Sequence, residues 1–216
     1  MNNRIIYQLG HLNLNDLGVV VKSADGLFDL PAPRTRTEEQ WADMSGKMVD
    51  VKNAPTFESR EIDLDCSMVC ESITDFVKKS QQLRDLFLAP DLLRLTVTIG
   101  NTSLYYLVYL RDGIEFDRKW GEGVILASFT LSLVEPEPFK RVYMATVAKD
   151  TTLTAELTAV HPVNIYWDDG EVTYDATTGK VPHTYAAAGD RVIIITGDIK
   201  QLKSTIINAT LIWTLF

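Results

Sequence analysis

Apolar and polar residues alternate in several short segments of the first two-thirds of the chain. In residues 60–66 (R-E-I-D-L-D-C), charged side chains alternate with apolar ones, and residues 93–99 and 126–133 show the same period of two. This period is typical of a strand with one buried face. Residues 104–110 (L-Y-Y-L-V-Y-L) are instead apolar or aromatic throughout, which predicts a strand covered on both sides. The pattern therefore predicts a mainly β structure.

One segment has a helical period instead. Its apolar residues recur at the spacing of one helix face. They are Ile73, Phe76, Val77, Leu83, Leu86 and Phe87. Ser72 is suited to the N-cap, and Pro90 ends the helix because the residue before a proline avoids the helical region. We expect one α-helix over about residues 73–88, with its apolar stripe lying on a sheet.

The composition changes near residue 140, after which threonine is more frequent. Pro136 and Pro138 stand just before this change. They cannot both lie in a central strand, because each lacks the N–H that the ladder needs. The sequence therefore predicts two domains, residues 1–138 and 141–216.

The predicted second domain consists of short apolar segments separated by turn residues. The segments read as strands are 142–148, 153–159, 163–167, 191–196 and 205–213. Short strands at this spacing indicate a small β-sandwich.

Charge and composition exclude several classes of protein. The chain has 216 residues, with 21 Lys and Arg against 29 Asp and Glu, and a net charge of −8. This balance argues against specific nucleic-acid binding. No apolar run approaches the ~20 residues of a membrane helix, and residues 1–10 lack the pattern of a secretory signal. We therefore expect no membrane insertion and a protein that stays inside the cell until assembly or lysis. Cys66 and Cys70 are expected to be buried thiols rather than a disulfide.

The sequence contains no motif of a known catalytic or cofactor-binding site. Its three histidines, at positions 11, 161 and 183, are scattered. We therefore predict no enzyme, no catalytic or cofactor-binding residue and no metal site. Glu135 and Glu137 flank the boundary prolines and are expected in a solvated turn.

Three residues are candidates for contact with a ligand or a host surface. Asp168 and Asp169 precede Gly170 and are interpreted as a β-turn, with a calcium or sugar contact as the alternative. Trp120 lies in residues 118–123 (R-K-W-G-E-G), a loop-like stretch between two strands, and is the first choice for an exposed, functional tryptophan.

Residues 163–197 resemble the PKD-type immunoglobulin-like domain. The hallmarks of that family are a W-x-x-G-D-G-like turn and an H-T-Y-x-x-x-G segment before a strand. The matching residues here are Trp167, Asp168, Asp169, Gly170, His183, Thr184, Tyr185 and Gly189. Asp168 stands where the closest form of the motif has glycine. The resemblance implies structural roles: Trp167 in the sandwich core, a turn at 168–170, and a loop tied to the sheet by 183–185.

Residues 12–138 are similar to the N-terminal domain of distal tail proteins of long-tailed phages. The similarity lies in the order of elements rather than in one sharp motif. These are D-L-G at 16–18, P-R-T-R at 33–36, a W-x-D-x-x-G turn at 41–46, F-E-S-R-E-I at 57–62, the single helix, and L-S-L-V-E-P at 131–136. The family implies a tail-tube-like β-sandwich or barrel with one helix. It also implies a ring of six copies that links the tail tube to the tail-tip or baseplate hub.

These resemblances predict a structural protein of a phage or prophage tail tip, located in the virion or, before assembly, in the cytoplasm of the lysogenic host. A ring protein needs strand edges that pair with neighbouring copies. The second domain would decorate the ring and contact a host glycan. The alternative is a bacterial surface or secreted module for adhesion or carbohydrate binding. An enzyme with a β-sandwich accessory domain ranks last.

Overall fold

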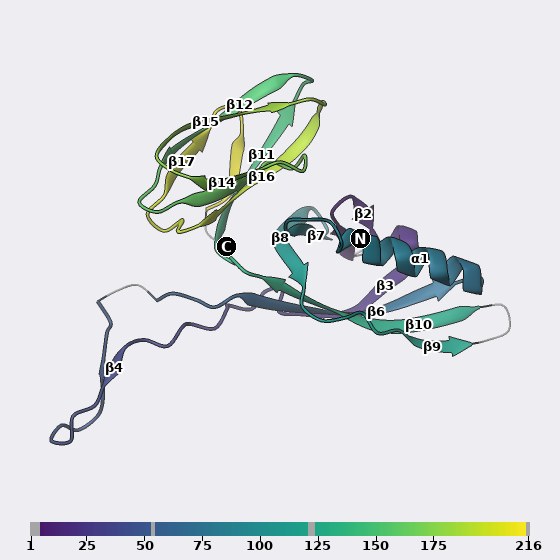
Figure 1. Cartoon of the computed structure of the whole chain (residues 1–216), viewed down its shortest axis with the longest axis horizontal. Coiled ribbons are helices and arrows are strands. Elements are labelled where there is room, and N and C mark those ends of the chain that lie inside the picture. The colour runs from purple at the N-terminus through teal and green to yellow at the C-terminus, as the bar shows by residue number, and fades with distance from the viewer. Residues whose placement is uncertain (1–4, 53–54, 121–123, 215–216) are drawn as a thin grey trace. The chain divides into compact units, whose positions relative to one another are not determined.

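Strands form most of the chain in the computed structural model, which describes residues 5–52, 55–120 and 124–214. The expected mainly β fold with one α-helix is confirmed. The chain divides into two compact units, Met1–Pro136 and Glu137–Phe216 (Figure 1). Among the described residues, no helix is long and apolar enough to cross a membrane.

The main sheet of the first unit has the strand order β2-β1-β7-β8-β10-β6-β3, and β9 also pairs with β10. All its pairs are antiparallel. Its elements are β1 (Ile5–Leu9), β2 (Leu12–Asn13), the 3-10 helix η1 (Leu14–Leu17), β3 (Val19–Asp25), β6 (Arg60–Cys70), β7 (Leu93–Ile99), β8 (Thr102–Leu110), β9 (Asp117–Trp120) and β10 (Ile125–Glu135). A separate two-stranded sheet joins β4 (Glu38–Glu39) to β5 (Met48–Val49).

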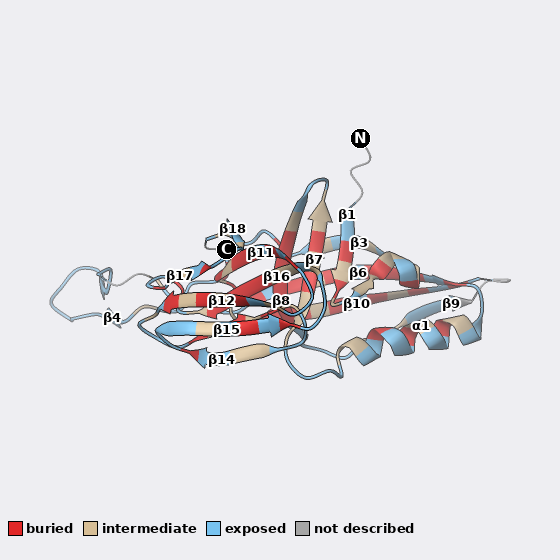
Figure 2. Ribbon diagram, turned by 90° about the horizontal axis from the view of Figure 1, so that it is seen from above, coloured by how far each residue is buried: buried red, intermediate tan, exposed pale blue. Residues whose placement is uncertain are grey.

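The pairing of β6 with β10 is the longest ladder of the first unit and runs from Cys70↔Ile125 to Arg60↔Glu135. The apolar positions predicted by the alternation are buried (Figure 2), and because they are two residues apart along each strand they share one face. They are Ile62, Leu64 and Cys66 on β6 and Ala127, Phe129, Leu131 and Leu133 on β10. Serine, threonine and aspartate occupy the middle of the other face, and the pair Leu126↔Val69 lies toward one end of it. The chain also buries β8 on both sides from Leu104 to Val108, as predicted, but Tyr109 is 45% exposed, so the prediction for residues 104–110 is wrong at this residue.

The single α-helix, α1 (Ile73–Leu86), begins after the N-cap Ser72, whose hydroxyl accepts a hydrogen bond from Asp75 N. Phe76 is buried and packs edge-on against Phe116, which in turn contacts Phe129 of β10. These aromatic contacts attach the helix to the sheet.

The buried side of α1 is narrower than the predicted stripe. Phe76 and Leu83 are buried, but Ile73 and Val77 are exposed. The N-terminal turns of the helix therefore leave apolar surface in solvent, and the interpretation of the stripe as wholly core-facing is wrong for these two residues.

Arg60 and Glu135 form an ion pair inside the first unit, with 3.7 Å between Nη1 and Oε2. Glu135 also accepts a hydrogen bond from Leu107 N of β8 at 3.3 Å. The Arg60 guanidinium donates to the Leu27 carbonyl and lies over the Tyr106 ring. The pair therefore links β6, β10 and β8 inside the first unit.

The expectation that Glu135 lies in a solvated turn is wrong. Strand β10 continues through this residue, and its side chain is fully buried. The prolines misled the prediction because they follow the last strand residue and do not interrupt the strand.

The second unit is a sandwich of two antiparallel sheets, with the orders β14-β13-β16-β11-β18 and β15-β12-β17. Its strands are β11 (Lys140–Val147), β12 (Thr151–Thr158), β13 (Val163–Tyr166), β14 (Val172–Ala176), β15 (Gly179–Tyr185), β16 (Gly189–Gly197), β17 (Lys203–Ile206) and β18 (Thr210–Trp213). Side chains from both sheets share one core, which contains Trp167, Tyr185, Ile193 and Leu153.

The predicted strand 205–213 is two strands in different sheets. Asn208 has a φ of +66°, a left-handed conformation that turns the chain between β17 and β18. Strands β14 and β15 were not predicted. Pro182 weakened the signal of β15, but this strand lies at a sheet edge, where the missing N–H costs no ladder bond.

Removing the Glu135 carboxylate should destabilise the first unit strongly. In Glu135→Ala, the buried Arg60 charge loses its partner, and we expect a loss of about 3–5 kcal/mol in the free energy of unfolding. Urea titration followed by circular dichroism measures this loss. Glu115→Ala removes an exposed carboxylate from the same unit and should cost less than about 0.5 kcal/mol. Equal stability of the two variants would contradict the role assigned to the ion pair.

The two cysteines are free and buried, as expected. Burial, with the nearby charge of Asp65, raises the pKa of the Cys66 thiol to about 12, and burial also raises the pKa of Cys70. A raised pKa lowers the thiolate fraction, so native protein in mildly alkaline buffer should react with a disulfide reagent about a hundredfold more slowly than guanidinium-unfolded protein. Equally fast labelling of native and unfolded chains would contradict this prediction.

Candidate functional site

Trp167 lies in the core of the second unit at the end of β13. Its side chain is fully buried, and its Nε1 donates to Thr173 Oγ1 at 2.9 Å. The indole stacks on the His183 ring, with centroids 4.6 Å apart and planes at 12°. The Tyr185 hydroxyl donates to the Trp167 carbonyl at 2.9 Å. Trp167 therefore acts as a packing centre that is closed to ligands.

The carboxylates of Asp168 and Asp169 make hydrogen bonds within the same unit. Asp169 Oδ2 lies 2.7 Å from His183 Nε2. Asp168 Oδ2 accepts a hydrogen bond from Val192 N at 2.8 Å, and the Arg191 guanidinium donates to the Asp168 carbonyl. These contacts join the turn after β13 to strands β15 and β16.

The remaining residues of the motif shape the backbone around this network. Gly170 has a φ of +92°, which an L-amino acid rarely adopts, so the turn after Asp169 requires glycine. Thr184 of β15 points to the outer face of its sheet. Its Oγ1 lies 2.8 Å from Thr152 Oγ1 on the neighbouring strand β12, and the two hydroxyl groups share a hydrogen bond. Gly189 begins β16 and pairs with Val147.

Burial raises the pKa of the Tyr185 phenol, and the negative charges of Asp169 and Asp168 raise it further. The phenol therefore stays protonated and keeps its hydrogen bond to the Trp167 carbonyl. Because the polar groups around Trp167 are used to hold the turn, their geometry supports a structural role.

Trp120 is the last residue of β9, and its backbone pairs with Ile125 of β10. The prediction of a loop over residues 118–120 is therefore wrong, because Asp117–Trp120 is a strand. The side chain of Trp120 and residues 121–123 lie outside the part of the chain that the structure describes. Contact of Trp120 with a ligand stays a prediction.

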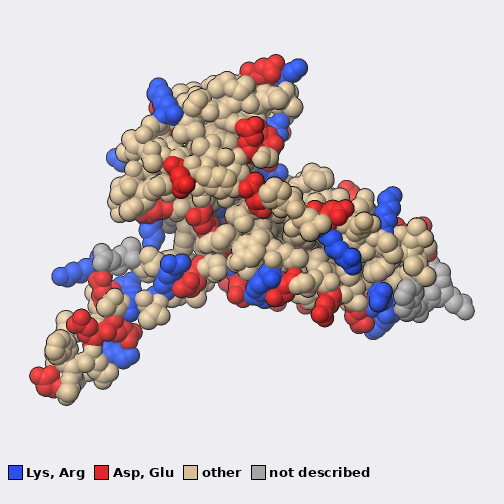
Figure 3. All heavy atoms as spheres, in the orientation of Figure 1, with Lys and Arg blue, Asp and Glu red and all other residues tan. Residues whose placement is uncertain are grey.

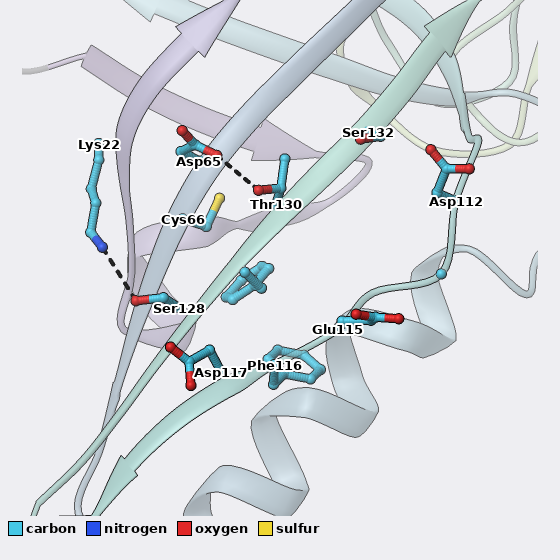
Figure 4. Close-up of a pocket in the computed structure, with 12 residues that line it drawn as sticks. Lys22, Asp65, Cys66, Asp112, Glu115, Phe116, Asp117, Ser128, Thr130 and Ser132 are labelled. Carbon is cyan, nitrogen blue, oxygen red and sulfur yellow. Dashed lines mark hydrogen bonds between the residues drawn. The ribbon is translucent and has the colours of Figure 1, made fainter.

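A groove on the first unit was not anticipated from the sequence. Lys22 and the carboxylates of Asp65, Asp112, Glu115 and Asp117 line it, and its floor carries Ser128, Thr130 and Ser132 of β10 (Figure 4). The alternation in β10 predicted the hydroxyl-bearing face, but only the fold brings the carboxylates of separate segments beside it.

The groove is held by internal hydrogen bonds. Asp65 accepts from Thr130 at 2.8 Å and from Ser23 at 3.0 Å, and these bonds lower the pKa of its carboxyl group. Lys22 Nζ donates to Ser128 Oγ. Within the residues that the structure describes, no three His, Cys, Asp or Glu side chains are grouped so that they could hold a metal ion.

Strands β3, β6, β10 and β9 form a four-stranded antiparallel layer within the main sheet, and among the described residues the outer edges of β3 and β9 pair with no further strand. Beyond β9, strand β10 pairs with β8 at Leu133↔Leu110 and Val134↔Tyr109. Strand β3 pairs with β6, and β9 pairs with β10. Val69 N donates a hydrogen bond to Gly18 O. Because alternate residues of an antiparallel strand bond to opposite sides, the N–H and C=O groups of Gly18 and Val20 face β6. The N–H and C=O groups of Val19 and Val21 therefore face the outer edge of β3.

Residues 29–52 and 55–58, here called the arm, leave the main sheet just after Gly26. A Cβ at Gly26 would lie only 1.9 Å from the Glu61 carbonyl oxygen, so the chain can pass β6 here only with glycine. The hairpin β4–β5 lies within the arm and is supported by the ion pair Lys47–Glu38 at 2.6 Å. Several apolar arm residues are exposed: Leu30, Trp41, Met44, Met48 and Val51.

No protein-family model matches the sequence, and no curated protein matches it. Solved structures with a similar fold include the Dit protein of phage SPP1, described as a hub adsorption apparatus in phages that infect Gram-positive bacteria. It shares 14% identity over 97% of this chain and 85% of its own, with a TM-score of 0.47. A chain of the phage p2 baseplate in its activated conformation with Sr shares 8% identity over 90% of this chain and 98% of its own, with a TM-score of 0.48.

Both similar structures come from phage adsorption or baseplate assemblies. Their TM-scores are below 0.5, so we base the proposed function on the strand edges, the arm and the surfaces of this chain.

Removing the Asp169 carboxylate should destabilise the second unit. In Asp169→Ala, the buried His183 Nε2 loses its partner, and we expect a loss of about 1–3 kcal/mol in the free energy of unfolding. Glu171→Ala is the matched control. Its carboxylate lies 3.6 Å from His183 Nδ1 but is 78% exposed, so its loss should cost less than about 0.5 kcal/mol. Urea titrations of both variants measure these losses. An equal loss of unfolding free energy in Glu171→Ala and Asp169→Ala would contradict the role assigned to Asp169.

Proposed function

We propose that the chain is a structural component of a phage or prophage tail tip, similar to distal tail proteins. In this proposal, six copies form a ring that links the tail tube to the tail-tip or baseplate hub in the virion, and no catalytic step is involved. The first unit, with domain bounds of 1–138, would form the ring. The observation that carries the proposal is the four-stranded layer with a strand edge at each end.

An even number of antiparallel strands gives the layer a useful property. Its two end strands, β3 and β9, run in opposite directions. When copies are repeated head to tail, β3 of one copy meets β9 of the next in antiparallel orientation. The ladder can then continue from copy to copy, and rotation closes it into a ring. An exposed strand edge otherwise risks uncontrolled aggregation.

The arm supports the same assembly. Trp41 is 57% exposed and Val51 is 75% exposed. Apolar side chains left in water forgo the free energy that burial would supply, so the arm by itself is unfavourable. A two-residue ladder contributes little stability by itself. We infer that the arm packs its apolar side chains against a neighbouring copy of the chain.

The polar face of the layer suits the wall of a channel. It carries Asp63, Asp65, Ser67, Ser128 and Thr130, so hydroxyl and carboxylate groups predominate. Such a surface does not attract a phosphate backbone. Figure 3 shows acidic and basic side chains interspersed on the visible face, without a broad basic patch.

The second unit would decorate the ring as a PKD-type immunoglobulin-like domain, with bounds of 141–216. Its support is the buried Trp167–His183–Tyr185 cluster and the turn held by Asp168 and Asp169. Contact of Asp168, Asp169 or Trp120 with a host glycan stays a prediction. The two aspartates would have to use oxygens that the internal hydrogen bonds leave accessible.

Ring formation should depend on the outer edge of β3. Val21→Pro removes an N–H that faces this edge, and an edge strand tolerates proline there because the bonds to β6 are kept. We expect the unchanged chain to form hexamers, or to associate with rising concentration, and Val21→Pro to remain monomeric. Light scattering coupled to size-exclusion chromatography measures this, and negative-stain images of the unchanged chain should show sixfold rings.

Val21→Thr is the control because it keeps the N–H and nearly the same side-chain shape, so it should associate like the unchanged chain. Circular dichroism checks that both variants are folded. A strict monomer at every concentration would overturn the proposed ring. Rings formed equally well by Val21→Pro would show that the β3 edge is not the contact.

A further inference from the structure

An open groove of about 550 Å³ on the second unit gathers three cationic side chains. Arg141 comes from β11, Lys180 from β15 and Lys203 from β17. Glu156 is the one carboxylate among the lining residues that the structure describes. Hydroxyl groups of Thr158, Thr178, Ser204 and Thr205 complete the polar lining.

The sheet register places most of this chemistry on one surface. Glu156 pairs with Lys180 on one side and with Thr205 on the other, and Thr158 pairs with Lys203. Directly paired residues point to the same face of a sheet. The outer face of β15-β12-β17 therefore presents two lysines and several hydroxyl groups side by side.

Arg141 is held in place before any ligand arrives. Its Nη1 donates to Ser204 Oγ at 3.0 Å, and its other terminal nitrogen donates to the Leu202 carbonyl. The Tyr143 hydroxyl lies 2.8 Å from the same Ser204 Oγ. A guanidinium fixed in this way loses little side-chain entropy when it meets an anion.

The concentration of positive charge is unusual for this unit. Residues 137–216 contain seven Lys and Arg and nine Asp and Glu. Three of these seven cations line the groove, together with one of the nine carboxylates. Lys180 is paired with Glu156 at 2.9 Å, so the groove keeps a charge of +2 in an otherwise acidic unit.

We propose that this groove binds an anionic polysaccharide, a sugar chain that carries phosphate, sulfate or carboxylate groups. Arg141 and Lys203 would contact the anionic groups, while the threonine and serine hydroxyls would hydrogen-bond the sugar. None of the groove's lining residues within the described chain is aromatic, so the groove lacks the stacking platform that single-stranded nucleic acids use.

This inference extends the host-contact part of the proposed function to residues other than Trp120, Asp168 and Asp169. It does not require a ring, because all the groove residues lie in one unit of one chain. Failure of ring assembly and failure of polysaccharide binding are therefore separate results.

The test is titration calorimetry of the full chain at low salt with four defined probes. Polygalacturonate, dextran sulfate and poly(glycerol phosphate) supply carboxylate, sulfate and phosphate groups, and neutral dextran supplies the sugar alone. We expect binding to at least one anionic polymer and none to dextran. The double variant Lys180→Gln/Lys203→Gln should bind that polymer about tenfold more weakly, because it loses the Lys203 contact and leaves the Glu156 carboxylate without its lysine partner, so that the groove charge falls from +2 to 0.

Lys149→Gln is the control because it removes an exposed cation of the same unit that lies outside the groove, and its affinity should stay within about twofold. Light scattering of the double variant should match that of the unchanged chain. Equal losses in the double variant and in Lys149→Gln would overturn the proposal. So would the absence of binding to all three anionic polymers, or binding of a DNA oligonucleotide in their place.

Discussion

The long antiparallel ladder between β6 and β10 is the constraint on which the first unit depends. Its pairing from Cys70↔Ile125 to Arg60↔Glu135 gives the layer one apolar face and an opposite face that is polar in its middle part. The apolar face requires a cover, to which α1 contributes through Phe76 and Phe116. The polar face and the outer edges of β3 and β9 remain for other partners. A one-residue slip would exchange the two faces, so the ladder also fixes the surface that the unit presents.

Local patterns were sufficient to predict the elements whose burial follows their own sequence. The alternation in residues 126–133 matches the buried and exposed faces of β10, and Ser72 begins α1. The errors came from positions where distant segments decide the outcome. Glu135 is buried because Arg60 and Leu107 N lie beside it, and no local signal shows either contact. Ile73 is likewise exposed although it belongs to the apolar stripe, and its local pattern does not show this.

The candidate sites divide in the same way. The conspicuous residues of the second unit, such as Trp167 and His183, could be found from the motif resemblance, but they are packed against each other. The groove around Arg141 could not be found, because its cations come from three strands in two sheets. Lysines and threonines are common on exposed strands, and only the register shows that they share one surface.

The second unit shows why a recognisable motif and a binding surface need not coincide. A small sandwich has little core, so its large aromatic residues and buried hydrogen bonds are used for stability. Asp169 is an example, because its carboxylate already hydrogen-bonds the buried His183 and is therefore less available to bind a ligand. In the proposal above, binding therefore uses the outer face of a sheet, where side chains can be substituted without disturbing the packing of the core. On this reasoning, the motif positions the sheets, and the faces that they expose carry whatever specificity the unit has.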